Sequence, residues 1–340
     1  MRAWLLEDSS GPEAWHLGSV ETPRPGPRDV RVALKASALN HLDLWVSKGL
    51  PKPPAFPHVG GADGAGVIDV VGEDVDGLSV GQEVLIDPST SCGVCDACDR
   101  GDIPFCTDFK IVGEHRWGTH AEHIVIPAVN AAPKPASLGW PEAAAFGLVT
   151  SSALRMLRRA RLAPGETALV VGVGGGTSIA AFALAPVLGA TAVFATSRQA
   201  WKRAWALENG ADGAFDSDGA FDEEVRSLTG GRGVDVVIEN VGTATWERSM
   251  RSLARGGRLV TNGSTTGRTA QLHLPTLFWR QLEVIGSTMN DHREFDEAAE
   301  LVAEGRVRIP VDTTFGFDEF PAALERLESG EQLGKIVLGR

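Results

Sequence analysis

The fold is decided by residues 167–178, which read TALVVGVGGGTS. Residues 167–171 form an apolar run that is typical of a buried strand in a parallel sheet. Four glycines follow within residues 172–176, and then an apolar helix is expected over 179–188 and a second strand over 191–196. In this order of elements the N-terminus of a helix follows a glycine turn, where backbone N–H groups bind phosphate.

The glycine turn predicts a dinucleotide site, because glycines let the backbone approach a pyrophosphate closely. The full Gly-x-Gly-x-x-Gly spacing does not close, since its third place falls on Thr177 or Ser178. Glycines alone would also fit a flexible turn, but the flanking strands and helix favour dinucleotide binding. The residues expected to contact the pyrophosphate are Gly174, Gly175, Gly176, Thr177 and Ser178.

The end of the second strand bears on which dinucleotide is bound. An NAD site usually has Asp or Glu there, which accepts a hydrogen bond from the ribose 2′-hydroxyl. This chain has Ser197 and Arg198, with Lys202 one helical turn further on. Ser197 can donate to a 2′-phosphate and Arg198 can pair with it, although a solvated helix start also explains the two cations. The missing acid favours NADPH over NADH.

Around this unit the chain divides into three stretches. The first, residues 1–147, is rich in proline and glycine and indicates an irregular β-barrel, with short strands at 30–35, 66–72, 81–86 and 123–127. The second, residues 148–288, alternates strands and helices, with further buried strands at 234–238, 258–261 and 282–285. The third, residues 289–340, has a helix at 294–304 and a closing strand at 335–338. The expected fold class is α/β, a barrel joined to a doubly wound parallel sheet.

Composition restricts the partners and the chemistry. The formal net charge of -12 argues against nucleic acid as the main partner, since no basic face is offered to phosphates. No apolar run reaches the roughly 20 residues that a membrane span needs, and the apolar stretch at the N-terminus is too short for a signal peptide, so a cytoplasmic location is expected. The chain contains no tyrosine, which excludes a mechanism that uses a tyrosine acid or base.

The only four cysteines predict a structural zinc site. Cys92, Cys95, Cys98 and Cys106 have the spacing C-x2-C-x2-C-x7-C, in which neighbouring thiolates converge and a longer loop brings in the fourth. Four thiolates leave no open coordination position, so one such zinc would brace structure and not activate water. Disulfides and a redox-active C-x-x-C are the alternatives, and the use of every cysteine favours zinc.

These features resemble the medium-chain dehydrogenase/reductase superfamily, which contains the zinc alcohol dehydrogenases and the quinone oxidoreductases. The resemblance covers nearly the whole chain: the barrel-like start, the four-cysteine lobe at about 90–110, the dinucleotide unit, and residues 334–338. Residues 40–45 and 61–66 match the two landmarks of its first domain. The resemblance implies a GroES-like catalytic domain over 1–147, a Rossmann domain over 148–288, and a return to the first domain over 289–340.

The same landmarks depart from the zinc enzymes. The three places that hold the catalytic zinc ligands are occupied by Asn40, Ala62 and Phe146, and these side chains cannot bind the metal. The proton-relay places hold Leu42 and Trp45. A rebuilt second metal site from His41, His58 and Asp63 is a minor alternative, because a lone histidine is more often a hydrogen-bonded structural residue.

Without a Lewis acid, the resemblance implies NADPH-dependent reduction of an enone, an enal or a quinone by hydride transfer. Asn40 is expected to donate a hydrogen bond to the substrate carbonyl, and His41 to steady a phosphate or relay a proton, unless it is simply an exposed loop residue. The alternatives are an NADP-dependent alcohol dehydrogenase or carbonyl reductase, and a non-catalytic NADPH sensor.

Further cofactor contacts are expected where such folds place the nicotinamide, at strand ends or the domain junction: Thr150, Asn240, Gly263, Ser264 and Ser287. Ordinary turn chemistry is the alternative for each of them. Lys335 is expected to reach the pyrophosphate or to be a plain surface lysine. By the same resemblance the chain is expected to be a homodimer that pairs through an edge strand at 282–285.

Overall fold

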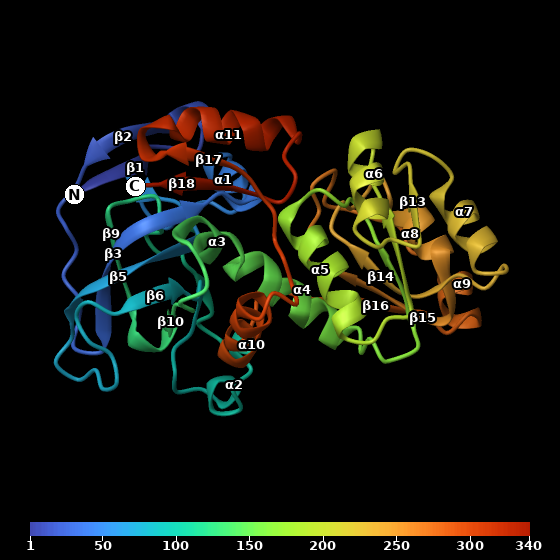
Figure 1. Cartoon of the computed structure of the whole chain (residues 1–340), viewed down its shortest axis with the longest axis horizontal. Coiled ribbons are helices and arrows are strands. Elements are labelled where there is room, and N and C mark those ends of the chain that lie inside the picture. Colours follow the sequence, from blue (N-terminus) through green and yellow to red (C-terminus); the bar gives the residue numbers. More distant parts are fainter. The chain divides into compact units, whose positions relative to one another are not determined.

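The computed structural model describes residues 1–340 and divides into two compact units (Figure 1). The first unit comprises Met1–Ser151, Met289–Gly305 and Ile309–Arg340. The second comprises Ser152–Thr288 and the short segment Arg306–Arg308. The chain therefore leaves the first unit a few residues after the expected position of 147 and returns to it after 288, except for the Arg306–Arg308 segment.

The first unit is built on a seven-stranded, mostly antiparallel sheet. Its strands run in the order β10 (Ala131–Pro133), β6 (Glu83–Ile86), β5 (Asp63–Val71), β3 (Asp29–Ala38), β18 (Lys335–Gly339) and β17 (Val311–Gly316), and β9 (His123–Pro127) also pairs with β3. The register between β3 and β5 shifts after Arg31 and again after Leu34. Such bulges bend a strand, so the sheet curls around a core that includes Val30, Val32 and Leu34.

Two smaller sheets complete the strands of this unit. One has the order β2 (Trp15–Ser19), β1 (Arg2–Leu6) and β4 (His58–Val59), and the other pairs β7 (Ser89–Thr90) with β8 (Lys110–Ile111). The helices are α1 (His41–Ser47), α2 (Asp96–Asp99), α3 (Trp140–Ala145), α10 (His292–Ala303) and α11 (Phe320–Ser329). Short 3-10 turns lie at Pro12–Ala14, Ile103–Phe105, Ala128–Asn130 and Phe317–Glu319.

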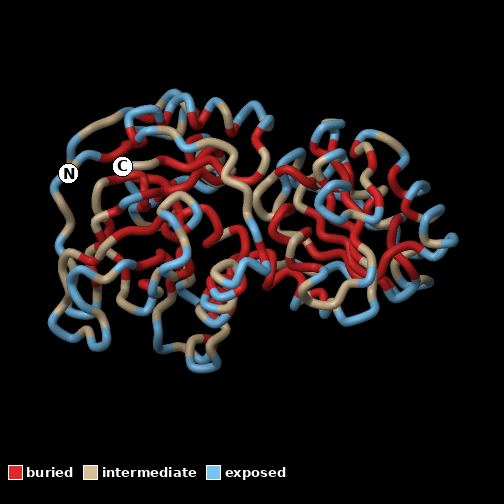
Figure 2. The backbone as a smooth tube through the Cα atoms, in the orientation of Figure 1, coloured by how far each residue is buried: buried red, intermediate tan, exposed pale blue.

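The second unit is a six-stranded parallel sheet. Its strand order is β13 (Gly213–Phe215), β12 (Ala192–Thr196), β11 (Thr167–Val170), β14 (Val234–Glu239), β15 (Leu253–Thr261) and β16 (Glu283–Gly286). Every residue of β14 is buried, as Figure 2 shows for the centre of this sheet. Its helices are α4 (Gly147–Arg159), which begins in the first unit, α5 (Gly176–Val187), α6 (Ala200–Glu208), α7 (Phe221–Leu228), α8 (Trp246–Ser252) and α9 (Leu274–Trp279).

The strand order reverses at β11, because β12 lies on one side of it and β14 on the other. In doubly wound sheets ligands bind at the carboxyl ends of the strands at such a reversal. Residues 171–176 follow β11 at this point and lead into α5. The expected α/β class, with a barrel-like domain and a doubly wound parallel sheet, is confirmed. None of the helices combines the length and the apolarity needed to cross a membrane.

Candidate active site

The turn after β11 is shaped by glycines in the left-handed region. Gly172 has φ 77° and Gly174 has φ 133°, conformations that other residues adopt only under strain. A side chain on Gly174 would also meet Lys202, whose Cδ and Nζ lie 2.6 and 3.0 Å from the place of a Cβ. Gly175 caps α5 and faces open space. The turn therefore leaves Gly175 and Gly176 partly exposed at the helix N-terminus, with the ammonium group of the buried Lys202 beside Gly174.

Two side-chain hydroxyls hydrogen-bond to backbone atoms at the start of this turn. Ser178 is buried, and its Oγ donates to Val171 O at 3.1 Å and accepts from Asn240 Nδ2 at 3.4 Å. Thr196 Oγ1 accepts from Gly172 N at 3.1 Å. Ser178, expected as a pyrophosphate contact, thus has its side chain turned toward β11, whereas Thr177 remains partly exposed at the start of α5.

The end of β12 carries the groups expected to select the dinucleotide. Ser197 is buried and Arg198 is exposed. Arg203, which no local sequence pattern marks, donates to Ser197 O at 2.8 Å and to Arg198 O at 3.0 Å, and pairs with Asp216 at 3.3 Å. Arg203 therefore holds the backbone of this loop and compensates the charge of Asp216. The Arg198 side chain on the same loop is exposed.

Three of the expected nicotinamide contacts have buried polar atoms without a partner. In the second unit these atoms are Asn240 Oδ1 and Ser287 Oγ, and in the first unit the atom is Thr150 Oγ1, in a side chain with no exposed surface. Buried polar groups are normally hydrogen-bonded, and leaving one unsatisfied costs about 1–3 kcal/mol. Each of these atoms thus fits a polar ligand. The backbone at Gly263 lies close to Asn240, and Ser264 is exposed.

Glu239, at the end of β14, is a residue that sequence reasoning missed. Its fully buried carboxylate accepts from Val241 N at 2.6 Å, Gly242 N at 2.9 Å, Thr245 Oγ1 at 2.9 Å and Ser249 Oγ at 2.6 Å. These four donors hold the turn that presents Asn240. The available signal was an acid directly after the apolar run Val236–Ile238 of the same strand.

In the first unit, α1 begins with a capping box between Asn40 and Asp43. Asp43 Oδ2 accepts from Asn40 N at 2.8 Å, and Asp43 Oδ1 accepts from Gly61 N at 3.0 Å and lies 3.3 Å from His120 Nε2. Burial alone would raise the pKa of the Asp43 carboxyl, but His120 and the Asn40 backbone N–H lower it below its usual value. The capping box thus joins the two landmark segments, 40–45 and 61–66.

The side chain of Asn40 belongs to a second buried group of polar atoms. Asn40 Nδ2 donates to Asp63 Oδ2 at 2.9 Å, and Lys335 Nζ donates to Asp63 Oδ2 at 2.8 Å and to Asn40 Oδ1 at 2.5 Å. Leu148 N donates to Asp63 Oδ1 at 2.7 Å. The alternative that Lys335 is a plain surface lysine is therefore wrong, because its side chain is only 2% exposed and its ammonium group has two buried partners.

The other residues at the ligand places of the zinc enzymes are packed in the core. Ala62 is buried, and Phe146 packs against Phe295 with ring centroids 5.9 Å apart.

The two histidines considered for a second metal site lie in different surroundings. His58 is buried with its Nε2 3.0 Å from Gly113 O, and burial lowers its pKa. His41 is partly buried, and its ring lies 6.3 Å from that of Trp45.

The four cysteines converge in a lobe closed by the β7–β8 pair. Their Sγ atoms all lie within 4.8 Å of one another, and the distances include 3.5 Å for Cys92–Cys106, 3.6 Å for Cys95–Cys98 and 3.8 Å for Cys92–Cys98. Tetrahedral Zn–S bonds of about 2.3 Å place sulfurs roughly 3.8 Å apart, so the quartet fits the ion. The backbone N–H of Cys98 lowers the pKa of Cys95 to about 6, whereas burial raises the pKa of Cys106 to about 11.

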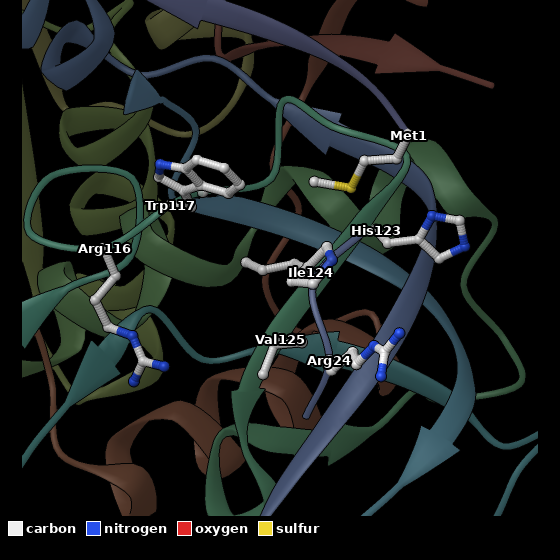
Figure 3. Close-up of a pocket in the computed structure, with 9 residues that line it drawn as sticks. Met1, Arg24, Arg116, Trp117, His123, Ile124 and Val125 are labelled. Atoms are coloured by element: carbon white, nitrogen blue, oxygen red, sulfur yellow. The ribbon is translucent and has the colours of Figure 1, made fainter. Parts of the chain in front are cut away.

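A cavity of about 220 Å³ lies elsewhere, beside β9 (Figure 3). Figure 3 shows the side chains of Met1 and Trp117 near Ile124, with Arg24 and Arg116 well apart from each other. None of the expected site residues lines this cavity, which is formed by Met1, Pro23, Arg24, Arg116, Trp117, Gly118, His123, Ile124 and Val125. It is therefore separate from the candidate active site.

Comparison with known proteins agrees with this arrangement. Residues 26–136 match the family model of the alcohol dehydrogenase GroES-like domain, and residues 162–304 match that of the zinc-binding dehydrogenase. A solved NAD-dependent alcohol dehydrogenase is 39% identical, covers 100% of both chains and has a TM-score of 0.96.

Two reductases are also similar to this chain. The acryloyl-coenzyme A reductase of Metallosphaera sedula is 29% identical over 96% of both chains. The crotonyl-CoA carboxylase/reductase of Cereibacter sphaeroides is 28% identical over 95% of this chain and 83% of its own. With its GroES-like first unit, its parallel nucleotide-binding sheet and these full-length relatives, the chain belongs to the medium-chain dehydrogenase/reductase superfamily of NAD(P)-dependent oxidoreductases.

Proposed function

We propose that this protein reduces an alkene conjugated to a carbonyl group, or a quinone, by hydride transfer from NADPH and without a catalytic zinc. The observation that carries the proposal is the set of residues at the zinc-ligand places. Two of them, Ala62 and Phe146, are buried apolar side chains, and the third, Asn40, is an amide held by Asp63 and Lys335.

A site with hydrogen-bond donors and no metal suits a conjugated alkene better than an alcohol or a simple ketone. Alcohols and simple ketones need strong polarisation of the C–O bond, which a metal supplies in the zinc enzymes. In a conjugated alkene, hydride adds to the β-carbon and negative charge develops on the carbonyl oxygen. Hydrogen-bond donors alone can stabilise that charge. Relatives named acryloyl-coenzyme A reductase and crotonyl-CoA carboxylase/reductase extend the proposed class to enoyl thioesters.

The second unit supplies the groups that would hold NADPH. The backbone at Gly174–Gly176 is proposed to bind the pyrophosphate, with the Lys202 ammonium group beside it. Ser197 and Arg198 are proposed to bind the 2′-phosphate, and the loop that carries them is held by Arg203. The unpartnered Asn240 and Ser287 atoms are proposed to contact the nicotinamide end, where the bound cofactor supplies the hydride.

The cysteine quartet is proposed to hold one structural zinc ion, and a reducing compartment such as the cytoplasm would keep these thiols from forming disulfides. A homodimer is also proposed, through the edge strand β16 and the neighbouring α9. Phe278 and Trp279 are 68% and 70% exposed on α9, and Val284 is exposed on β16. Exposed aromatics beside an unpaired sheet edge favour pairing with a second copy.

An alcohol dehydrogenase is the second candidate, because a solved structure of that name is 39% identical over the whole chain. A substrate panel separates the candidates: enones, enals, quinones and enoyl thioesters with NADPH or NADH, against primary and secondary alcohols with NADP⁺ or NAD⁺. We expect the highest kcat/KM for an electrophile with NADPH. Faster oxidation of an alcohol would reject the proposal, and NADPH binding without any turnover would assign the chain to the cofactor sensors.

A further inference from the structure

Lys335 is a buried cation in the first unit that contacts the side chain of Asn40. It is the first residue of β18, its side chain is 2% exposed, and its ammonium group lies between Asn40 Oδ1 and Asp63 Oδ2. An ammonium group taken out of water is costly unless a carboxylate and further acceptors compensate it. The Asp63 carboxylate, 1% exposed, provides that compensation.

Asn40 is held at both its backbone and its side chain. The backbone N–H of Asn40 donates to Asp43, and the side-chain amide of Asn40 lies between Lys335 and Asp63. Asp63 is itself held at its other oxygen by the backbone N–H of Leu148, at the start of α4. Two residues further along the same helix is Thr150, whose buried hydroxyl has no partner. Asp63 thus links the Asn40 amide to the start of the helix that carries Thr150.

Only one orientation of the Asn40 amide is compatible with these neighbours. Lys335 has donors and no acceptor, whereas the Asp63 carboxylate has acceptors only. The amide oxygen must therefore face Lys335 and the amide nitrogen must face Asp63. A flipped amide would turn N–H toward an ammonium group and oxygen toward a carboxylate. The nitrogen carries two hydrogens, and Asp63 Oδ2 accepts one of them, so the second remains for another acceptor.

We propose that Lys335 and Asp63 are positioning residues that orient Asn40 so that its second amide N–H donates to the substrate carbonyl oxygen. This inference rests on the proposed function. As hydride reaches the β-carbon, the alkene π electrons shift toward the carbonyl and its oxygen becomes negative. The oriented N–H bonds to that oxygen, and the α-carbon afterwards takes a proton from water. Lys335 polarises the amide through Oδ1, which makes the amide N–H a stronger donor.

The proposal differs measurably from the expectation that Lys335 binds the pyrophosphate. A lysine that binds the cofactor would, when replaced by methionine, weaken NADPH affinity. A lysine that orients Asn40 would leave NADPH affinity near that of wild type and lower kcat. A displacement of about 1 Å in a catalytic group can cost about 10²-fold in rate, and the loss of one donor to a developing oxyanion costs about 10²–10³-fold.

The experiment compares wild type with Lys335→Met, Asn40→Asp and a matched control, Lys134→Met. Lys134 is also a largely buried lysine of the first unit, paired with Glu83 at 2.9 Å, and it contacts none of the site residues described here. The measurements are kcat and KM for the best electrophile, the NADPH dissociation constant by fluorescence, and the isotope effect on kcat with NADPH deuterated at the transferred position.

We expect Lys335→Met to lower kcat about 10²-fold and Asn40→Asp, which replaces the donor by an acceptor, to lower it about 10²–10³-fold. NADPH affinity should stay near wild type in both, and the isotope effect should rise because hydride transfer becomes slower. Lys134→Met should retain the wild-type kcat. If Lys335→Met loses NADPH affinity and keeps kcat, the positioning role is overturned.

Lys335→Met leaves the Asp63 carboxylate uncompensated and can fail to fold, so the double variant Asp63→Asn/Lys335→Met provides a second route. It removes both buried charges, which is often neutral or stabilising for a protein. We expect a folded protein with low kcat, and wild-type kcat in this variant would also overturn the role. A wild type without turnover on any electrophile refutes the proposed function together with the inference, whereas an active wild type with fully active variants refutes the inference alone.

Discussion

Glu114 has a largely buried carboxyl group, and its protonation should make the stability of the protein depend on pH. The residue lies on the 112–118 loop, which is packed tightly against the first unit: a Cβ on Gly113 would lie 2.5 Å from the backbone of Gly61. The Glu114 side chain is 12% exposed, and its Oε1 lies 3.5 Å from His115 Nε2. Burial raises the pKa of the Glu114 carboxyl from 4.5 to about 7.

The raised pKa determines the direction of the pH effect. Between the unfolded value of 4.5 and the folded value of about 7, the folded chain holds a proton that the unfolded chain has released. The contribution of Glu114 to the free energy of unfolding is therefore greatest below its unfolded pKa. This contribution is lost as pH rises through its folded pKa. At about 1.4 kcal/mol per unit the whole shift corresponds to roughly 3 kcal/mol, and residual solvent contact reduces this to about 1–3 kcal/mol.

The assay is the thermal midpoint of wild type and Glu114→Gln across the pH range from 4.5 to 8.5, with the exposed Glu325→Gln as control. We expect wild type to lose about 2–6 °C relative to Glu114→Gln between the ends of this range, at about 2 °C per kcal/mol for a chain of this size. His115 has a pKa lowered by burial and acts in the opposite direction, but it is present in both chains. A difference that is constant with pH, or that grows in favour of wild type as pH rises, would show that burial does not raise the pKa of Glu114 in the folded chain.

Three further predictions follow from the sites described above. Metal analysis should find about one zinc per chain, and Cys98→Ser should lose it; a metal-free wild type that is fully folded contradicts this. Arg198→Ala should weaken NADPH binding roughly tenfold and leave NADH binding unchanged, whereas tighter NADH than NADPH binding by wild type contradicts the cofactor assignment. Phe278→Asp on α9 should convert the dimer to a monomer in analytical ultracentrifugation, and a wild type that is already monomeric contradicts the proposed dimer.

Much of the fold could be predicted because its signals are local. The apolar run at 167–171 and the glycines after it depend only on residues adjacent in sequence, and the structure places β11 and the start of α5 there. The cysteine lobe is similar, since the spacing of the four cysteines alone predicts that their sulfurs converge. Element boundaries differ by a few residues, as with β15, which begins at Leu253 and not at the expected 258.

The polar contacts of the candidate site could not be predicted in the same way. Lys335 meets Asn40 across 295 positions and Asp63 across 272 positions of the chain, so no local pattern connects them. From the sequence, Lys335 was expected to contact a pyrophosphate or solvent, and not the buried carboxylate of Asp63. Arg203 and Glu239 were missed for the same reason, because their importance lies in which backbone groups the fold brings to them.

The separate location of the cysteine lobe changes how a common inhibition test should be interpreted. Figure 1 shows α2, which contains Cys98, well apart from α1 and β18. Asn40 directly precedes α1, and Lys335 is the first residue of β18. With zinc in the lobe, a chelator would inactivate the enzyme slowly, at the rate at which metal leaves and the lobe unfolds. A metal that takes part in hydride transfer would instead give immediate inhibition competitive with substrate. The time course of inactivation, more than its occurrence, therefore reports what the metal does.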